Sequence, residues 1–141
     1  MFATLNRTWS AVLFDIDGTI LDTTPGIPAA VVPGVEGLLQ ALNDHGIPLA
    51  VATIKTAEEA DALLDQFNLR QYFTVIATAS PRLLDKADIV GDALAQLEGQ
   101  GADLSMPVLV GDRVHDVEGA AANGVPAIIV APHFSIARAI F

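Results

Sequence analysis

Short apolar runs alternate along the chain with longer segments in which apolar residues recur at helical spacing. The runs are apolar on both alternating faces, as strands buried inside a parallel sheet are. Five such strands are expected, at Val12–Asp15, Pro48–Thr53, Thr74–Thr78, Pro107–Val110 and Ala127–Val130. Helices are expected at Gly34–His45, Thr56–Phe67, Asp85–Leu97 and Val114–Asn123, with a short closing helix at Ser135–Ile140. Strands and helices in alternation predict a doubly wound α/β fold with a mainly parallel five-stranded sheet in three layers, α/β/α.

Composition favours a single folded domain. The 141 residues are one domain by length, so we expect one domain over residues 1–141. Hydrophobic residues make up 52% and charged residues 17%, which excludes an intrinsically disordered chain. The absence of cysteine excludes disulfides and thiolate ligands, and it is compatible with the reducing cytoplasm in which we expect the protein. No apolar window is long enough to span a bilayer, and the first residues lack an apolar signal region.

The formal net charge of −10 limits the partners. Seventeen acidic residues against seven lysines and arginines would repel phosphate groups on a polymer or a membrane surface. We therefore expect neither a nucleic acid nor an anionic membrane as a partner.

Polar residues stand where the predicted parallel strands end, and ligands bind at this edge of open α/β sheets. The first strand ends in Asp15, which is followed by Asp17 and Gly18. A carboxylate can attack a phosphate monoester when a cation shields the phosphoryl charge, so Asp15 is the candidate nucleophile. Asp17 is the candidate general acid for the leaving oxygen and later the base for water. Gly18 permits a tight turn here and is expected beside the bound phosphate.

The remaining candidates follow the other strands. Asp112 and Asp116 are one helical turn apart and offer the oxygen ligands that Mg²⁺ prefers, and Asp15 can share the ion with Asp112 from a neighbouring strand end. Asp116 is expected as a further ligand or as a support for the others. Thr53 offers a hydroxyl and a backbone N–H near a helix N-terminus as a phosphate cradle. Lys86, at the start of a helix, supplies positive charge for the phosphoryl oxygens and the nucleophile.

These residues resemble the four motifs of the haloacid dehalogenase-like (HAD) hydrolase superfamily, and the resemblance extends from Val12 to about Val130. The motifs are Asp15-Ile16-Asp17-Gly18-Thr19, Val51-Ala52-Thr53, Lys86 and Gly111-Asp112-Arg113-Val114-His115-Asp116. The resemblance implies a Mg²⁺-dependent phosphatase with a Rossmann-like core and an aspartyl-phosphate intermediate. The implied metal ligands are Asp15, Asp112, Asp116 and the backbone carbonyl of Asp17. Lys55 is a rival to Lys86, but Lys86 has the position of the family's lysine.

The motif wording is most similar to phosphoglycolate-phosphatase-like members, but the helical cap of those relatives has no room here. Only thirty-five residues separate Asp17 from Thr53, and a predicted helix uses a third of them. Twenty-five residues separate Lys86 from Asp112, enough for one helix and a loop. The chain is therefore expected to be a capless core, with the apolar segment Thr23–Pro33 as a loop lying on the site. Without a cap, the phosphatase chemistry carries over from these relatives and the phosphoglycolate specificity does not.

The residues are compatible with two classes of function. The first is the phosphatase, because the second acid, Asp17, suits a leaving oxygen that needs a proton, whereas a dehalogenase expels a halide without one. The second is a non-catalytic binding or partner module with an unused site. A response-regulator receiver domain is disfavoured, because Asp15 and Asp17 flank a single residue instead of coming from different strands.

The expected partner is a phosphorylated small molecule or a larger phosphorylated substrate. Arg113, His115 and His133 are open candidates for substrate contact. A capless face exposes the site to water, so we also expect closure by a bulky substrate or by a second copy in a homo-oligomer. Ile27–Val32 and Ile136–Phe141 are the candidate contact segments.

Overall fold

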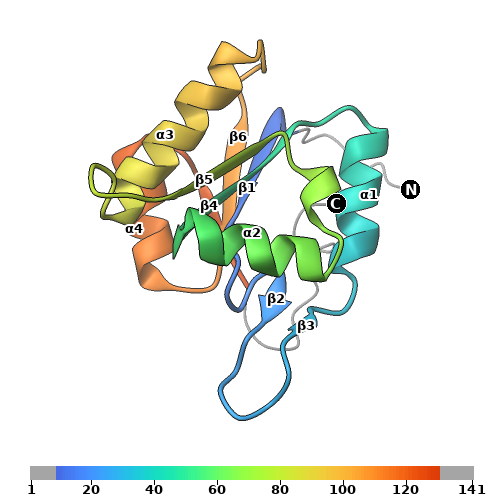
Figure 1. The fold of residues 1–141 in the computed structure, drawn as a ribbon. Helices are drawn as coiled ribbons and strands as arrows, with labels where there is room; N and C mark the ends of the chain where they lie inside the picture. The colour runs from blue at the N-terminus through green and yellow to red at the C-terminus, as the bar shows by residue number, and fades with distance from the viewer. Residues whose placement is uncertain (1–8, 131–141) are drawn as a thin grey trace.

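The central sheet consists of five parallel strands in the order β5-β4-β1-β6-β7 (Figure 1). The structure is a computed structural model, and it describes residues 9–130. The strands are β1 Ala11–Phe14, β4 Leu49–Thr56, β5 Val75–Ala79, β6 Pro107–Gly111 and β7 Ala127–Ile129. The parallel five-stranded sheet predicted from the apolar runs is confirmed.

Four α-helices cover the two faces of this sheet within the described residues. They are α1 Val35–Asp44, α2 Ala57–Gln66, α3 Lys86–Gly99 and α4 Val114–Ala122, and a 3₁₀ turn, η1 Arg70–Tyr72, precedes β5. One core joins α1 and α2 to one face of the sheet, and the other joins α3 and α4 to the opposite face. The expected α/β/α layers are confirmed (Figure 1). No helix among these residues combines the length and the apolar character needed to cross a bilayer.

The central strand β1 explains why the first carboxylate of the motif lies at the middle of the sheet. Val12 and Phe14 pack into the core under α1 and α2, whereas Ala11 and Leu13 pack into the core under α3 and α4. Side chains of a strand alternate between its faces, so a run buried on both faces requires helices on both. β1 pairs with β4 on one side and β6 on the other. Asp15 therefore leaves the sheet between the ends of these two strands.

A two-stranded antiparallel hairpin, β2 Leu21–Asp22 with β3 Ala30–Val31, follows β1 and was not predicted. It occupies much of the segment expected as a loop. In Figure 1 it projects beyond the carboxyl ends of the sheet strands. Between Asp17 and Thr53 the chain forms this hairpin and α1, so the expected absence of a helical cap is confirmed.

β4 continues three residues beyond Thr53, where the sequence predicted its end. Its pairing with β5 shifts register between Ala52 and Thr56, and the strand then continues to Thr56. Thr56 is the N-cap of α2 and forms a capping box with Glu59. Thr53 therefore lies within a strand and not at a helix N-terminus. The helix predicted at Ser135–Ile140 lies outside the described residues.

Candidate active site

Asp15 and Lys86 form a buried ion pair at the carboxyl end of β1. The Lys86 Nζ lies 3.1 Å from Asp15 Oδ1 and 2.9 Å from Asp116 Oδ1, and it donates a 2.6 Å hydrogen bond to the carbonyl of Ala52. Asp15 is 5% exposed, and its backbone N–H donates to the carbonyl of Val110. Lys86 is the first residue of α3, as predicted. One ammonium group thus connects the carboxylate that follows β1, the carboxylate of Asp116 in α4 and the backbone of β4.

Burial raises the pKa of Asp15 from 3.8 to about 6. Removal from water disfavours the charged carboxylate, and this is the largest effect. The charge of Lys86 acts in the opposite direction and lowers the pKa, while the nearby Asp116 raises it. Lys86 therefore offsets only part of the cost of burying the carboxylate.

Gly119 allows Lys86 to reach this position. A Cβ atom added to Gly119 of α4 would lie 2.7 Å from Lys86 Cγ and 3.1 Å from the Lys86 backbone carbonyl carbon. Any larger side chain would separate α4 from the first turn of α3. The close contact between these helices brings Lys86 and Asp116 together.

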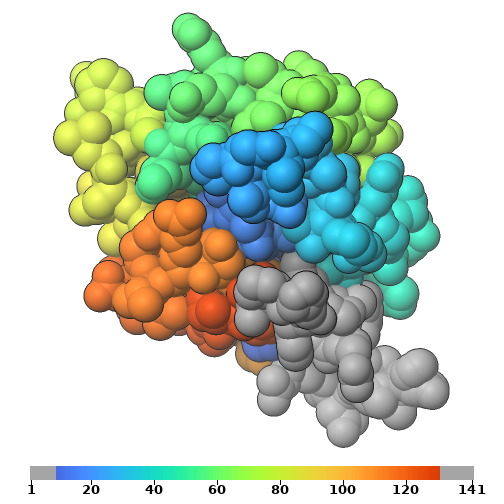
Figure 2. Space-filling model, turned by 90° about the horizontal axis from the view of Figure 1, so that it is seen from below, coloured from blue at the N-terminus to red at the C-terminus, as the bar shows by residue number. Residues whose placement is uncertain are grey.

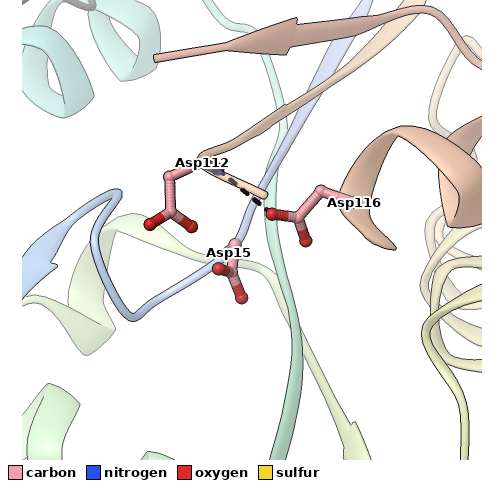
Figure 3. Close-up of side chains that lie close together, drawn as sticks. All are labelled: Asp15, Asp112 and Asp116. Atoms are coloured by element: carbon pink, nitrogen blue, oxygen red, sulfur yellow. Dashed lines mark hydrogen bonds between the residues drawn. The ribbon is translucent and has the colours of Figure 1, made fainter. Parts of the chain in front are cut away.

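Asp15, Asp112 and Asp116 present a cluster of carboxylates in which the nearest oxygen atoms all lie within 4.8 Å of one another (Figure 3). Asp116 is fully buried, and its Oδ2 accepts the backbone N–H groups of Asp112 and Arg113 at 3.1 Å each. Asp116 Oδ1 forms the ion pair with Lys86. Both oxygens of Asp116 are therefore engaged by protein groups.

Neither Asp112 Oδ1 nor Asp116 Oδ1 has a hydrogen-bond partner among the described residues, although both are buried. Asp112 differs because no ion pair with its Oδ1 is found there, whereas Asp116 Oδ1 is paired with Lys86. Burial is the main cause that raises the pKa of Asp112, and the charge of Arg113 lowers it. A Cβ atom on Gly18, whose φ is +76°, would overlap the Asp112 carboxylate, so a glycine is needed there. An unpartnered carboxylate oxygen in a cluster of acids matches the donor set of a hard divalent cation.

Asp17 lies outside this cluster and has a lysine of its own. Its Oδ2 is 3.2 Å from Lys55 Nζ, and its Oδ1 accepts a 2.7 Å hydrogen bond from the hydroxyl of Thr23. Asp17 lies within a helical turn in which the N–H groups of residues 19–21 all bond to the carbonyl of Ile16. The side chains of Asp17 and Lys55 are 31% and 22% exposed, so this pair lies nearer to solvent than the pair of Asp15 and Lys86.

Lys55 and Lys86, the two candidates for the family's lysine, thus contact different acids. Lys86 meets Asp15, as the motif order suggested, and Lys55 meets Asp17, which we had not predicted. The missed signal is the spacing of Thr53 and Lys55, because residues two apart on a strand point to the same side. The backbone N–H of Lys55 also donates to the buried hydroxyl of Thr53, at 3.1 Å.

The open candidates for substrate contact lie at the margin of the cluster. Arg113 Nε is 3.9 Å from Asp112 Oδ2, with a side chain that is 63% exposed. His115 Nε2 is 3.6 Å from Asp116 Oδ1 and partly exposed. His133 lies outside the described residues. The structure thus brings Asp15, Lys86, Asp112 and Asp116 into contact, with Asp17 close in sequence but paired separately.

Comparison with known proteins matches the chain to a family model and to curated proteins. The family model described as haloacid dehalogenase-like hydrolase matches residues 28–130. Tyrosine-protein kinase PtkA of Mycobacterium tuberculosis is 43% identical over 99 residues, which are 69% of this chain and 33% of PtkA. A phosphoglycolate phosphatase of Agrobacterium fabrum is 35% identical over 96 residues, which are 68% of this chain and 41% of that protein. The chain thus spans less than half the length of these curated relatives.

Solved structures share the fold. A predicted phosphatase from Clostridium acetobutylicum superposes with a TM-score of 0.77 at 24% identity, over 89% of this chain and 86% of that one. PtkA of Mycobacterium tuberculosis superposes with a TM-score of 0.63 at 40% identity, over 73% of this chain and 47% of that one. The first likeness concerns the fold alone, while the second agrees with the sequence match.

Proposed function

The chain belongs to the haloacid dehalogenase-like hydrolases, and from this premise we propose that it is a Mg²⁺-dependent phosphatase that hydrolyses phosphate monoesters through an aspartyl-phosphate on Asp15. The observation that carries the proposal is the buried contact of Asp15 with Lys86, beside the acids Asp112 and Asp116. A nucleophile, a fixed positive charge and a set of oxygen ligands are the parts that phosphoryl transfer requires.

The reaction has two steps. The Asp15 carboxylate forms a bond to phosphorus while the bond from phosphorus to the ester oxygen breaks, and Asp17 gives that oxygen its proton. Asp17 then takes a proton from water while the water oxygen bonds to phosphorus and the bond from phosphorus to the Asp15 oxygen breaks, which releases phosphate and the free Asp15 carboxylate. Lys86 keeps the Asp15 carboxylate in place, and its charge opposes the negative charge of the transferred group.

The carboxylate cluster fits the cation that the family resemblance implies. Among residues 9–130, Asp112 Oδ1 has no partner and Lys86 contacts only one oxygen of Asp15. Both oxygens of Asp116 contact protein groups, one through an ion pair with Lys86 and one through two backbone N–H groups. We infer that Asp15 and Asp112, with the backbone carbonyl of Asp17, would hold Mg²⁺, and that Asp116 orients its neighbours. The bound ion would supply charge that shields the phosphoryl oxygens from the nucleophile.

Phosphoryl transfer to another acceptor is the second candidate function. Its support is the 43% identity to a protein named a tyrosine-protein kinase. The two functions share the Asp15 chemistry and differ in whether water or a hydroxyl group takes the phosphoryl group. A non-catalytic module with an unused site is the remaining alternative.

Hydrolysis of p-nitrophenyl phosphate with and without Mg²⁺ tests the proposal. We expect turnover that depends on Mg²⁺ and that falls by at least about a thousandfold in Asp15→Asn, which keeps the shape and removes the nucleophile. Asp44→Asn is the matched control, because Asp44 is an exposed residue on α1 that hydrogen-bonds to Gln40. Full activity of Asp15→Asn would refute the mechanism. Transfer from ATP to a tyrosine peptide, without hydrolysis, would favour the second candidate.

A further inference from the structure

Asp17 is held by two partners that come from different parts of the chain. Its Oδ1 accepts the 2.7 Å hydrogen bond from the hydroxyl of Thr23, and its Oδ2 lies 3.2 Å from the Nζ of Lys55. Thr23 follows β2 in the hairpin, whereas Lys55 lies near the end of β4. In Figure 2 the hairpin, in blue, lies against the green segment in which β4 ends and α2 begins. Each oxygen of Asp17 is thus fixed by a different element.

These two partners serve Asp17 and no other acid within residues 9–130. Lys55 forms one ion pair there, with Asp17, and the hydroxyl of Thr23 donates to Asp17 alone. Glu59, in the first turn of α2, does not compete, because its Oε1 accepts the backbone N–H and the hydroxyl of Thr56. The hairpin and the end of β4 therefore each supply a donor to the same carboxylate.

The Asp17 side chain depends on these contacts for its position. It is 31% exposed and lies outside the carboxylate cluster, whereas Lys86 contacts both Asp15 and Asp116. A partly exposed side chain can change between staggered rotamers. A catalytic base must lie within hydrogen-bond reach of the proton that it takes, and a misplacement of about 1 Å can cost about a hundredfold in rate. One contact to each oxygen selects a single position for the Asp17 carboxylate.

The chemistry of the two partners suits the ionised form of Asp17. An ammonium group and a donating hydroxyl both complement a carboxylate. An ionised carboxylate accepts hydrogen bonds at about four positions, so Lys55 and Thr23 leave positions open for a proton from water. In the proposed reaction Asp17 is a carboxylate after it has given its proton to the leaving oxygen. The second step then begins from this form.

Resting on the phosphatase function proposed above, we propose that Lys55 and Thr23 are positioning residues that hold the Asp17 carboxylate where it takes the proton of the attacking water. The proton moves from water to Asp17 while the water oxygen bonds to phosphorus and the bond from phosphorus to the Asp15 oxygen breaks. Asp17 then carries the proton that the next leaving oxygen receives. Lys55 and Thr23 act through Asp17 and not on the phosphoryl group.

Hydrolysis of radiolabelled p-nitrophenyl phosphate allows the two steps to be measured separately. The value of kcat/KM reports the first step, in which p-nitrophenolate, a stable anion, leaves without needing a proton. The turnover rate divided by the amount of aspartyl-phosphate found by acid quench at steady state gives the rate constant of the second step. In Lys55→Met and in Thr23→Val we expect this rate constant to fall by about fivefold to tenfold, and kcat/KM to change by less than about twofold.

Conservative and neighbouring variants assign the effect to the contacts with Asp17. Lys55→Arg and Thr23→Ser keep a donor at each position, so their second step should stay within about threefold of that of the original protein. Thr24→Val is the matched control, because it removes a hydroxyl from the same hairpin, one that donates to Asp22. Both steps should be unchanged in this control. Circular dichroism and Mg²⁺ titration check that the fold and the metal site are intact in each variant.

The outcomes separate this inference from the phosphatase function. Equal losses in the two steps would show that the contacts support the fold or the metal site, and they would overturn the positioning role. An unchanged second step in Lys55→Met and Thr23→Val, or an equal loss in Thr24→Val, would overturn it as well. All three results leave the phosphatase standing. Turnover without aspartyl-phosphate on Asp15, or no turnover at all, would overturn the proposed function together with this inference.

Discussion

At the scale of single residues, two lysines lie at different depths and serve different acids. Lys86 is 4% exposed in its side chain and contacts Asp15 and Asp116, whereas Lys55 is 22% exposed and contacts Asp17. An ion pair removed from water depends strongly on both partners, because the remaining charge cannot be hydrated. A pair in contact with water loses little when one partner is removed. The two lysines should therefore respond differently to the same substitution.

We predict that Lys86→Met is far more harmful than Lys55→Met. Loss of Lys86 leaves buried carboxylates without a counter-charge, so the free energy of unfolding should fall by about 3–5 kcal/mol at neutral pH without metal. The turnover should fall by about 10²- to 10³-fold, because a charge aimed at the transferred group is lost. Loss of Lys55 should cost about 1 kcal/mol at most, or up to about tenfold in rate. Urea unfolding and steady-state kinetics measure both effects, and equal losses would contradict the assignment of Lys86 to the nucleophile.

At the scale of elements, the contact between α3 and α4 sets the geometry of the site. Gly119 lets the helices approach at Lys86, and the side-chain amide of Asn123 donates to the carbonyls of Ala87 and Gly119, at 2.9 Å each. Asn123 thus connects the end of α4 to the first turn of α3. Because Lys86 opens α3 and Asp116 lies in the first turn of α4, a shift between these helices moves both groups.

We predict that Gly119→Ala lowers both activity and stability, while the same change at Gly37 is stabilising. Alanine favours a helix over glycine by about 0.5–1 kcal/mol, and the space around Gly37 in α1 is open. At Gly119 the methyl group meets the backbone of Lys86, so overpacking should cost about 1–3 kcal/mol and displace the ammonium. Thermal unfolding and hydrolysis of p-nitrophenyl phosphate compare the two variants. A Gly119→Ala protein with normal turnover would show that the helix contact does not control the site.

The sequence predicted those parts of the site that depend on one element at a time. Asp15, Asp112 and Lys86 could be placed because each follows an apolar run or opens a helix. The pair of Asp17 and Lys55 was missed, because the spacing of Thr53 and Lys55 is informative only once β4 is known to extend past Thr53. The hairpin was missed because its strands have two residues each, which is shorter than any periodicity can show. The contact of Lys86 with Asp116 depends on how two helices pack, which is a property of the folded chain.

At the scale of the whole molecule, the carboxylate cluster couples stability to pH and to metal. The pKa of Asp15 is about 6 in the folded protein and about 3.8 in the unfolded one, so the folded state binds more protons between these values. A raised pKa contributes stability that is present below pH 4 and is lost as the pH rises through 6. The raised pKa of Asp112 acts in the same direction.

We predict that the metal-free protein loses up to about 3 kcal/mol of unfolding free energy between pH 4 and pH 7 through Asp15, from a shift of about two pKa units. Urea unfolding in EDTA should show a smaller slope against pH in Asp15→Asn. Mg²⁺ binds the deprotonated carboxylates, so it should stabilise the protein more at pH 7.5 than at pH 5. An equal effect of Mg²⁺ at both pH values, or an unchanged slope in the variant, would place the ion elsewhere.

The position of β1 at the centre of the sheet has a consequence for how the molecule folds. β1 is the first strand of the described residues, and both of its neighbours come later, with β6 almost a hundred residues away. Contacts between distant residues form late, because the intervening loop must first be closed at a cost in entropy. Asp15 therefore meets Asp112 and Asp116 only when nearly the whole chain has found its place. Recovery of catalysis after dilution from denaturant should follow the slowest folding phase. A chain still emerging from the ribosome carries Asp15 before the other residues of the site are in place around it.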